Sequence, residues 1–208
     1  MDNRIILVIH NLDAGACAEK LSQEECTAIA KKGGGTVLGI MAATLSRPDY
    51  ARVTREVRRI HEEFGITTPP VDPVRIARGL GVTVYFVTFE NDKKNVSGFF
   101  DCEERAIFVN KEEWPLRQTF TIAHELGHKV LHEEWAKSSE YRVLLRDQDY
   151  SGDEPHEKEA NAFAAQLLVP RFMLDEYWKS LTVEQLSQLF AVSVPMIRNR
   201  IAFEYGAK

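Results

Sequence analysis

Residues 121–132 have the sequence TIAHELGHKVLH, and this stretch decides which fold we expect for the chain. Apolar residues recur at helical spacing through it: Phe120, Ala123, Leu126, Val130 and Leu131. We therefore predict an amphipathic helix that runs to His132. On such a helix His124 and His128 are four residues apart, so their imidazoles lie on one face, about one turn apart.

Two neutral imidazoles at this spacing can bind one tetrahedral Zn²⁺ ion. Glu125 follows the first histidine and points to a neighbouring sector of the helix, where a carboxylate can take a proton from a water that attacks a carbonyl. Gly127 is less favourable than Ala in a helix by about 1 kcal/mol, so its position indicates close approach of another backbone or of a substrate. The motif predicts a hydrolytic metal site, with His124 and His128 as ligands and Glu125 as the base.

A catalytic zinc site of this kind needs a third protein ligand and keeps one open position. The candidates that follow in the sequence are His132, His156, Glu157 and Glu159. His132 is eight residues from His124, about 12 Å along the helix axis, which is too far to share one metal ion. We expect His132 to lie behind the ligands or at the surface.

The helical stretch EPHEKEANAFAAQLLV, residues 154–169, favours Glu157 as the third ligand. Its apolar face contains Ala160, Phe163, Ala164, Leu167 and Leu168. Glu157 lies one turn earlier on that face, where a carboxylate needs a partner such as a metal ion. Asn161, four residues further on, is placed to hydrogen-bond a ligand histidine. We expect Glu159 to face the flank and solvent, and His156 to cap the helix or face solvent.

The rest of the chain predicts an α+β fold, in which a small three-stranded sheet packs on helices and a helix-turn-helix-like pair closes the chain. Expected helices are 48–64, a short one capped by Asp72, 171–179, 182–191 and 195–204. Expected strands are 82–89, 96–100 and 106–110, the last two as a hairpin. Residues 133–153 are expected to be irregular. We assign residues 1–46 to an N-terminal extension of unknown role, 47–180 to the hydrolytic domain and 181–208 to the C-terminal helices.

The closing helical pair, residues 182–204, has two interpretations. Its periodicity is that of a helix-turn-helix, which would bind DNA. However, the second helix offers only Arg198 and Arg200 as cations, with Asn199 as a polar reader. Groove binding needs more phosphate contacts than this, so we expect the pair to pack on the core.

Composition limits the partners and the compartment. The formal net charge of −5 argues against a general affinity for nucleic acid or anionic membranes. Three cysteines without a CxxC pair predict reduced thiols rather than a disulfide framework. No stretch approaches the length of a membrane span, and the short apolar run at 5–9 does not resemble a signal peptide. We expect a cytoplasmic protein with no membrane partner.

The motif TIAHELGHKVLH, followed by EKEANAFAAQLLVP, resembles the ImmA/IrrE family of bacterial and phage metallo-endopeptidases. Three further segments are similar to that family: RRIHEEFGITTPPVDPVRIARGLGVTVYF, SGFFDCEERAIFVN and LSQLFAVSVPMIRNRIA. The resemblance covers roughly residues 50–205 and implies a gluzincin-like core. It also implies that His124, His128 and Glu157 bind zinc and that Glu125 is the catalytic base. Members typically sit beside a helix-turn-helix repressor and relieve repression, often by cleaving it.

Several alternatives remain open from the sequence. Two histidines and a carboxylate also accept Mn²⁺ or Fe²⁺. The protein could sequester a DNA-binding partner without cleaving it, as an anti-repressor or as a toxin–antitoxin-type module that pairs through residues 1–46. Tyr141, Tyr150 or His156 could stabilise the oxyanion of a tetrahedral intermediate. Strand 106–110 could form the edge of a cleft and hold an extended peptide.

Overall fold

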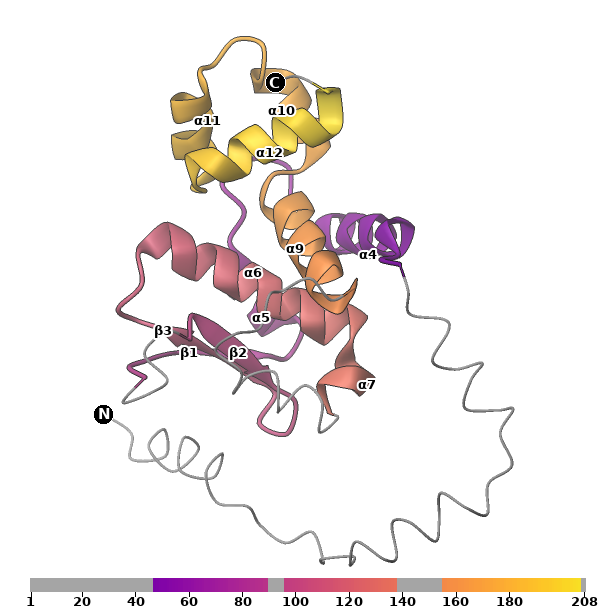
Figure 1. Cartoon of the computed structure of the whole chain (residues 1–208), viewed down its shortest axis with the longest axis vertical. Helices are drawn as coiled ribbons and strands as arrows, with labels where there is room; N and C mark the ends of the chain where they lie inside the picture. The colour runs from indigo at the N-terminus through magenta and orange to yellow at the C-terminus, as the bar shows by residue number, and fades with distance from the viewer. Residues whose placement is uncertain (1–46, 90–95, 138–154, 207–208) are drawn as a thin grey trace, which may run out of the picture. The chain divides into compact units, whose positions relative to one another are not determined.

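The computed structural model describes residues 47–89, 96–137 and 155–206. The chain divides between Ser46 and Arg47, and the described residues belong to the second unit, residues 47–208. The roles expected of residues 1–46 lie outside the described part of the chain. The second unit is a mixed α+β structure, mostly helical with one small sheet, and it confirms the expected fold class (Figure 1).

The sheet contains β1 (Thr83–Val87), β2 (Gly98–Asp101) and β3 (Ala106–Asn110) in the order β1-β3-β2. β2 and β3 form the expected antiparallel hairpin, whereas β1 and β3 are parallel. All five residues of β3 are buried, and both of its edges are paired. The expectation that this strand forms the edge of a cleft is therefore wrong, because its backbone groups already bond to two neighbouring strands.

The helix with the histidine motif is α6 (Pro115–Leu131), which packs on β2 and β3. A Cβ atom on Gly98 of β2 would lie 2.6 Å from Thr121 Cγ2, so only glycine allows α6 to approach the sheet this closely. α9 (Pro155–Leu168) packs against α6 and also against α4 (Tyr50–Glu63). The helix that bears Glu157 is thus enclosed by helices on two sides (Figure 1).

Two short helices complete this region. α5 (Pro73–Gly79) begins as expected with Asp72 as its cap and Pro73 in its first turn. α7 (Glu133–Ala136) is a single turn that follows His132, and it corrects the expectation of irregular structure from residue 133 onward. Residues 138–154 of that stretch lie outside the described residues.

The C-terminal helices are α10 (Arg171–Tyr177), α11 (Val183–Phe190) and α12 (Val194–Tyr205). Thr182 and Gln185 form a capping box at the start of α11, and Ala191 takes a left-handed conformation with φ of 52° at its end. Arg200 on α12 is buried, and it donates hydrogen bonds to the Val169 carbonyl at 3.2 Å and to Glu204 at 2.7 Å. The bond to Val169 joins α12 to the end of α9, and the bond to Glu204 lies within α12 and pairs the buried charge.

Candidate metal centre

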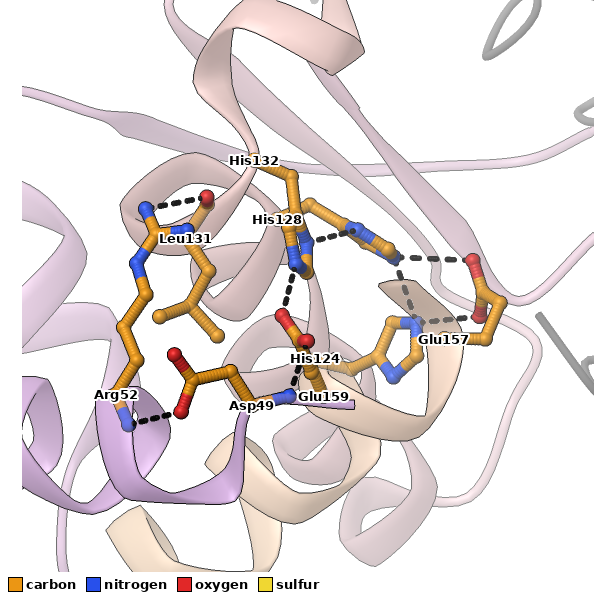
Figure 2. Close-up of polar contacts among 8 residues, drawn as sticks. All are labelled: Asp49, Arg52, His124, His128, Leu131, His132, Glu157 and Glu159. Atoms are coloured by element: carbon orange, nitrogen blue, oxygen red, sulfur yellow. Dashed lines mark hydrogen bonds and ion pairs between the residues drawn. The ribbon is translucent and has the colours of Figure 1, made fainter. Parts of the chain in front are cut away.

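Three side chains from two helices meet at one point of the molecule (Figure 2). His124 and His128 come from α6, and Glu157 comes from the first turn of α9. The Nε2 atoms of the two histidines are 3.1 Å apart. Glu157 Oε2 lies 3.2 Å from His124 Nε2, and Oε1 lies 3.2 Å from His128 Nε2. The two histidines of the motif therefore share one face, and Glu157 lies opposite them.

This triangle has the dimensions of a metal site. A tetrahedral zinc ion with bonds of about 2.0–2.1 Å has ligand atoms separated by about 3.3 Å. The two imidazole nitrogens are 3.1 Å apart, and each lies 3.2 Å from a different oxygen of the Glu157 carboxylate, so the potential ligand atoms are spaced as they are around one metal ion. Two imidazole nitrogens and one carboxylate are also a donor set found in catalytic zinc sites, with one position left for water. These residues can therefore hold a divalent metal ion without rearrangement.

The cluster is partly exposed to solvent. The side chains of His124 and Glu157 keep 14% and 17% of their surface exposed, whereas His128 keeps 2%. Glu125 is 6% exposed, and its charge is one of those that act on His124. Glu125 adjoins His124 in the sequence of α6 and is not part of the ligand triangle.

Glu157 and His124 each favour the charged form of the other. Burial raises the pKa of Glu157, but hydrogen bonds to His124 and His128 outweigh it and bring the pKa well below its usual range. Burial lowers the pKa of His124, but the bond to Glu157 and the charges of Glu125 and Glu157 outweigh it and raise the pKa. The site therefore attracts positive charge, which a metal ion can supply in place of protons.

Asn161 lies behind His124, one turn after Glu157 on α9. Its Oδ1 atom is 3.1 Å from His124 Nδ1, and it faces the ring from the side away from Glu157. An Nδ1–H group that donates to this oxygen leaves Nε2 of His124 bare and directed at the candidate metal position. The contact is the one that the four-residue spacing from Glu157 predicts.

His132 and Glu159 form a second polar pair, which the sequence did not reveal. Glu159 is only 8% exposed, so the expectation that it faces solvent is wrong. Glu159 Oε2 lies 2.8 Å from His132 Nε2, and Oε1 accepts a hydrogen bond from the backbone N–H of Asp49 at 2.7 Å. His132 Nδ1 in turn lies 3.3 Å from His128 Nδ1. Burial lowers the pKa of His132 to about 4, so this imidazole is neutral near pH 7.

The remaining candidates from the sequence do not join the ligand triangle. The His156 ring stacks on Trp135 with ring centroids 4.3 Å apart, and it lies edge-on to His132. Tyr141 and Tyr150, considered for oxyanion stabilisation, lie outside the described residues. Within the described ranges, His124, His128 and Glu157 are the group with the geometry of a metal site.

A groove of about 850 Å³ lies beside the cluster. Asn161 lines the groove, and so does Phe120, whose ring centroid is 6.1 Å from that of His124. Aromatic side chains are prominent in it: Trp114 is 82% exposed and Phe203 of α12 is 68% exposed. The charged residues that line it, Arg117, Lys158 and Arg200, are all basic. The groove runs from Phe120 and Asn161, which contact His124, to the C-terminal helices, and none of the three ligand residues lines it.

The fold and the cluster together define an α+β protein with a candidate metal site of two histidines and a glutamate. Residues 77–202 match the family described as the IrrE N-terminal-like domain, a peptidase family. The chain therefore belongs to this family of metallopeptidases, as the sequence motifs indicated.

Known relatives include the radiation response metalloprotease IrrE of Deinococcus deserti, which is 30% identical over 130 residues. That alignment covers 61% of this chain and 43% of the relative, so the chain spans less than half of that protein's length. An uncharacterized immunity region protein of Bacillus phage phi105 is 23% identical over 134 residues, covering 64% of this chain and 77% of the relative.

Among solved structures, a Mycobacterium tuberculosis transcriptional regulator has a similar fold. The TM-score is 0.54 at 17% sequence identity, over 73% of this chain and 46% of that chain. At this identity the likeness concerns the fold alone. In the described part of the chain, no helix has both the length and the apolar composition that a membrane crossing requires.

Proposed function

We propose that the protein is a metal-dependent endopeptidase that cleaves a helix-turn-helix transcriptional repressor and so relieves repression. The observation that supports the proposal most directly is the triangle of His124, His128 and Glu157, with Glu125 beside it. In this assignment the first three residues hold zinc, with Mn²⁺ or Fe²⁺ as substitutes. We place the reaction in the cytoplasm, where such a repressor is found.

The roles of the residues follow from their positions. Zinc held by His124, His128 and Glu157 would supply Lewis-acid activation of the attacking water and of the substrate carbonyl. Glu125 accepts the proton of the attacking water and returns it to the leaving amine. Asn161 holds His124 in the tautomer that leaves Nε2 bare.

The groove provides a place for the substrate polypeptide. It is lined by Asn161 and Phe120, which contact His124, and extends to Phe203 of α12. Its exposed aromatic side chains would accept apolar side chains of the substrate, and Arg117 and Lys158 would favour acidic residues among them. In this proposal α12 serves as a wall of the substrate site. Such a role also accounts for a helix-turn-helix-like pair that packs on a peptidase core.

Glu125→Gln tests the reaction directly. The zinc-loaded wild type is incubated with the repressor encoded beside its gene, and products are followed by mass spectrometry. We expect the wild type to cleave the repressor and Glu125→Gln to be slower by at least about a hundredfold, while the variant still binds zinc. Glu133→Gln is the matched control. Glu133 forms an ion pair of 2.9 Å with Lys129 and is not part of the cluster.

The same experiment separates cleavage from sequestration. A protein that acts only by binding would release the repressor from its operator equally well with Glu125→Gln. If Glu125→Gln still releases the intact repressor from its operator, the protein acts as a non-proteolytic anti-repressor. A repressor that stays intact and bound to its operator with wild-type protein would contradict both.

A further inference from the structure

A chain of hydrogen bonds runs from His128 away from the candidate metal position and into the protein (Figure 2). It passes from His128 Nδ1 to His132 Nδ1 at 3.3 Å, and from His132 Nε2 to Glu159 Oε2 at 2.8 Å. It ends at the backbone N–H of Asp49, which donates to Glu159 Oε1 at 2.7 Å. His132 and Glu159 are 5% and 8% exposed, so the chain is largely shielded from water.

Only one placement of the hydrogens satisfies this chain when His128 binds a metal ion. A ligating Nε2 carries no hydrogen, so a neutral His128 carries its hydrogen on Nδ1. That N–H must donate to His132 Nδ1, which must then be bare. The hydrogen of His132 is therefore on Nε2, where it faces the carboxylate of Glu159. The opposite placement would put a hydrogen on the metal-facing nitrogen of His128.

The outer end of the chain is anchored by backbone atoms rather than by flexible side chains. The Asp49 N–H belongs to the residue that caps α4, and the Asp49 carboxylate accepts from the Arg52 N–H at 2.9 Å. The Arg52 side chain donates to the Leu131 carbonyl at 2.7 Å, next to His132 in the sequence. The first turn of α4 thus holds both the end of α6 and the carboxylate of Glu159 (Figure 2).

We propose that His132 and Glu159 are positioning residues, which hold the His128 imidazole with a bare Nε2 directed at the metal and make it a stronger metal ligand. This inference rests on the metal site proposed above. A carboxylate behind an imidazole polarises it and raises the basicity of the ligand nitrogen. Asn161 orients His124 through a neutral amide, whereas the chain behind His128 leads to the carboxylate of Glu159.

The hydrogen placement can be measured in the wild type. Protein labelled with ¹⁵N on histidine and loaded with zinc is studied by long-range ¹H–¹⁵N NMR, which distinguishes Nδ1–H from Nε2–H rings. We expect His132 in the Nε2–H form and His128 in the Nδ1–H form. An Nδ1–H or doubly protonated His132 in the zinc-loaded protein would overturn the proposal. This measurement does not depend on the folding of any variant.

Zinc affinity, measured by competition with a chromophoric chelator, tests the consequence. We expect His132→Phe to weaken zinc binding by about 10- to 100-fold and Glu159→Gln to weaken it by about tenfold. His132→Asn retains an oxygen acceptor near the place of Nδ1, so it should bind zinc more tightly than His132→Phe. A merely structural role would not produce this rescue.

The matched control is His61→Gln. His61 is also buried, and its Nε2 lies 3.0 Å from the Leu167 carbonyl, but it is not part of the chain. We expect this variant to lose stability and keep its zinc affinity. Equal losses of zinc affinity in His61→Gln and His132→Phe, or none in His132→Phe, would overturn the proposal. Zinc binding that survives both His124→Ala and Glu157→Ala would instead refute the metal site itself.

Discussion

Gly127 of α6 lies directly against Ala160 of α9: a Cβ atom on Gly127 would be 3.1 Å from the Ala160 Cα. The same atom would be 3.3 Å from Phe163 Cβ. The glycine of the histidine motif therefore sets the distance between the helix that carries the two histidines and the helix that carries Glu157. The expectation of a close backbone approach at Gly127 is confirmed, and the partner is α9.

We expect Gly127→Ala to destabilise the protein and weaken metal binding. Alanine gains about 1 kcal/mol of helix propensity. Overpacking costs about 1–3 kcal/mol, and the contact here is with the backbone of a buried helix, which cannot rotate away as a side chain can. The net loss should be about 1–2 kcal/mol in denaturant unfolding, with weaker zinc affinity because Glu157 moves away from His124. A variant of unchanged or greater stability would contradict this account.

Much of the candidate site could be predicted because it depends on local periodicity. The four-residue spacing of His124 and His128 and the apolar face that contains Glu157 are properties of single helices. Each ligand is thereby placed on the correct side of its own helix. The contact between the two helices was indicated only indirectly, by a glycine in the middle of α6.

The features that the sequence did not reveal depend on distant partners. Glu159 is two residues from Glu157, which puts it on another side of α9, and it is buried because α4 covers that side. Its partner Asp49 is 110 residues away. The order of the strands was equally hidden. β1 pairs in parallel with β3, although β2 lies between them in the sequence. Neither pairing leaves a local pattern.

Metal removal should lower the thermal stability reversibly. A ligand that binds only the folded protein stabilises it, by about 2.7 kcal/mol at a free concentration of 100 times Kd. For a protein of this size that corresponds to a Tm shift of roughly 5–10 °C. We expect calorimetry to show this loss after chelation and its recovery when zinc is restored.

Variants show whether the cluster is the source of that shift. Glu157→Ala should abolish it, because one side of the triangle is lost. Glu113→Gln should retain the Tm shift. Glu113 accepts a hydrogen bond from the Ser97 hydroxyl at 2.9 Å and is not part of the cluster. A zinc-dependent Tm shift of full size in Glu157→Ala would show that the metal binds elsewhere.

DNA binding through the C-terminal pair should be absent even at low salt. Of the two cations on α12, Arg200 is 4% exposed and bonded to Glu204 and the Val169 carbonyl. Arg198 remains exposed, with Glu184 4.0 Å away. One exposed cation provides little of the phosphate contact that groove binding needs. An electrophoretic shift assay with random duplex DNA at low salt checks this, and salt-sensitive binding that Arg198→Ala weakens would reverse it.

The groove should determine how well a protein substrate binds rather than how fast the bond breaks. Trp114 and Phe203 line it and are largely exposed, so truncating either removes apolar contact without disturbing the core. With the repressor as substrate, we expect Trp114→Ala and Phe203→Ala each to raise KM by about 10-fold, as loss of an aromatic contact of 1–2 kcal/mol implies. kcat should change little, because neither side chain contacts the metal cluster.

Phe172→Ala is the control: Phe172 is 48% exposed but lies outside this groove, and its loss should leave KM unchanged. Equal effects of all three substitutions would show that the substrate does not use the groove.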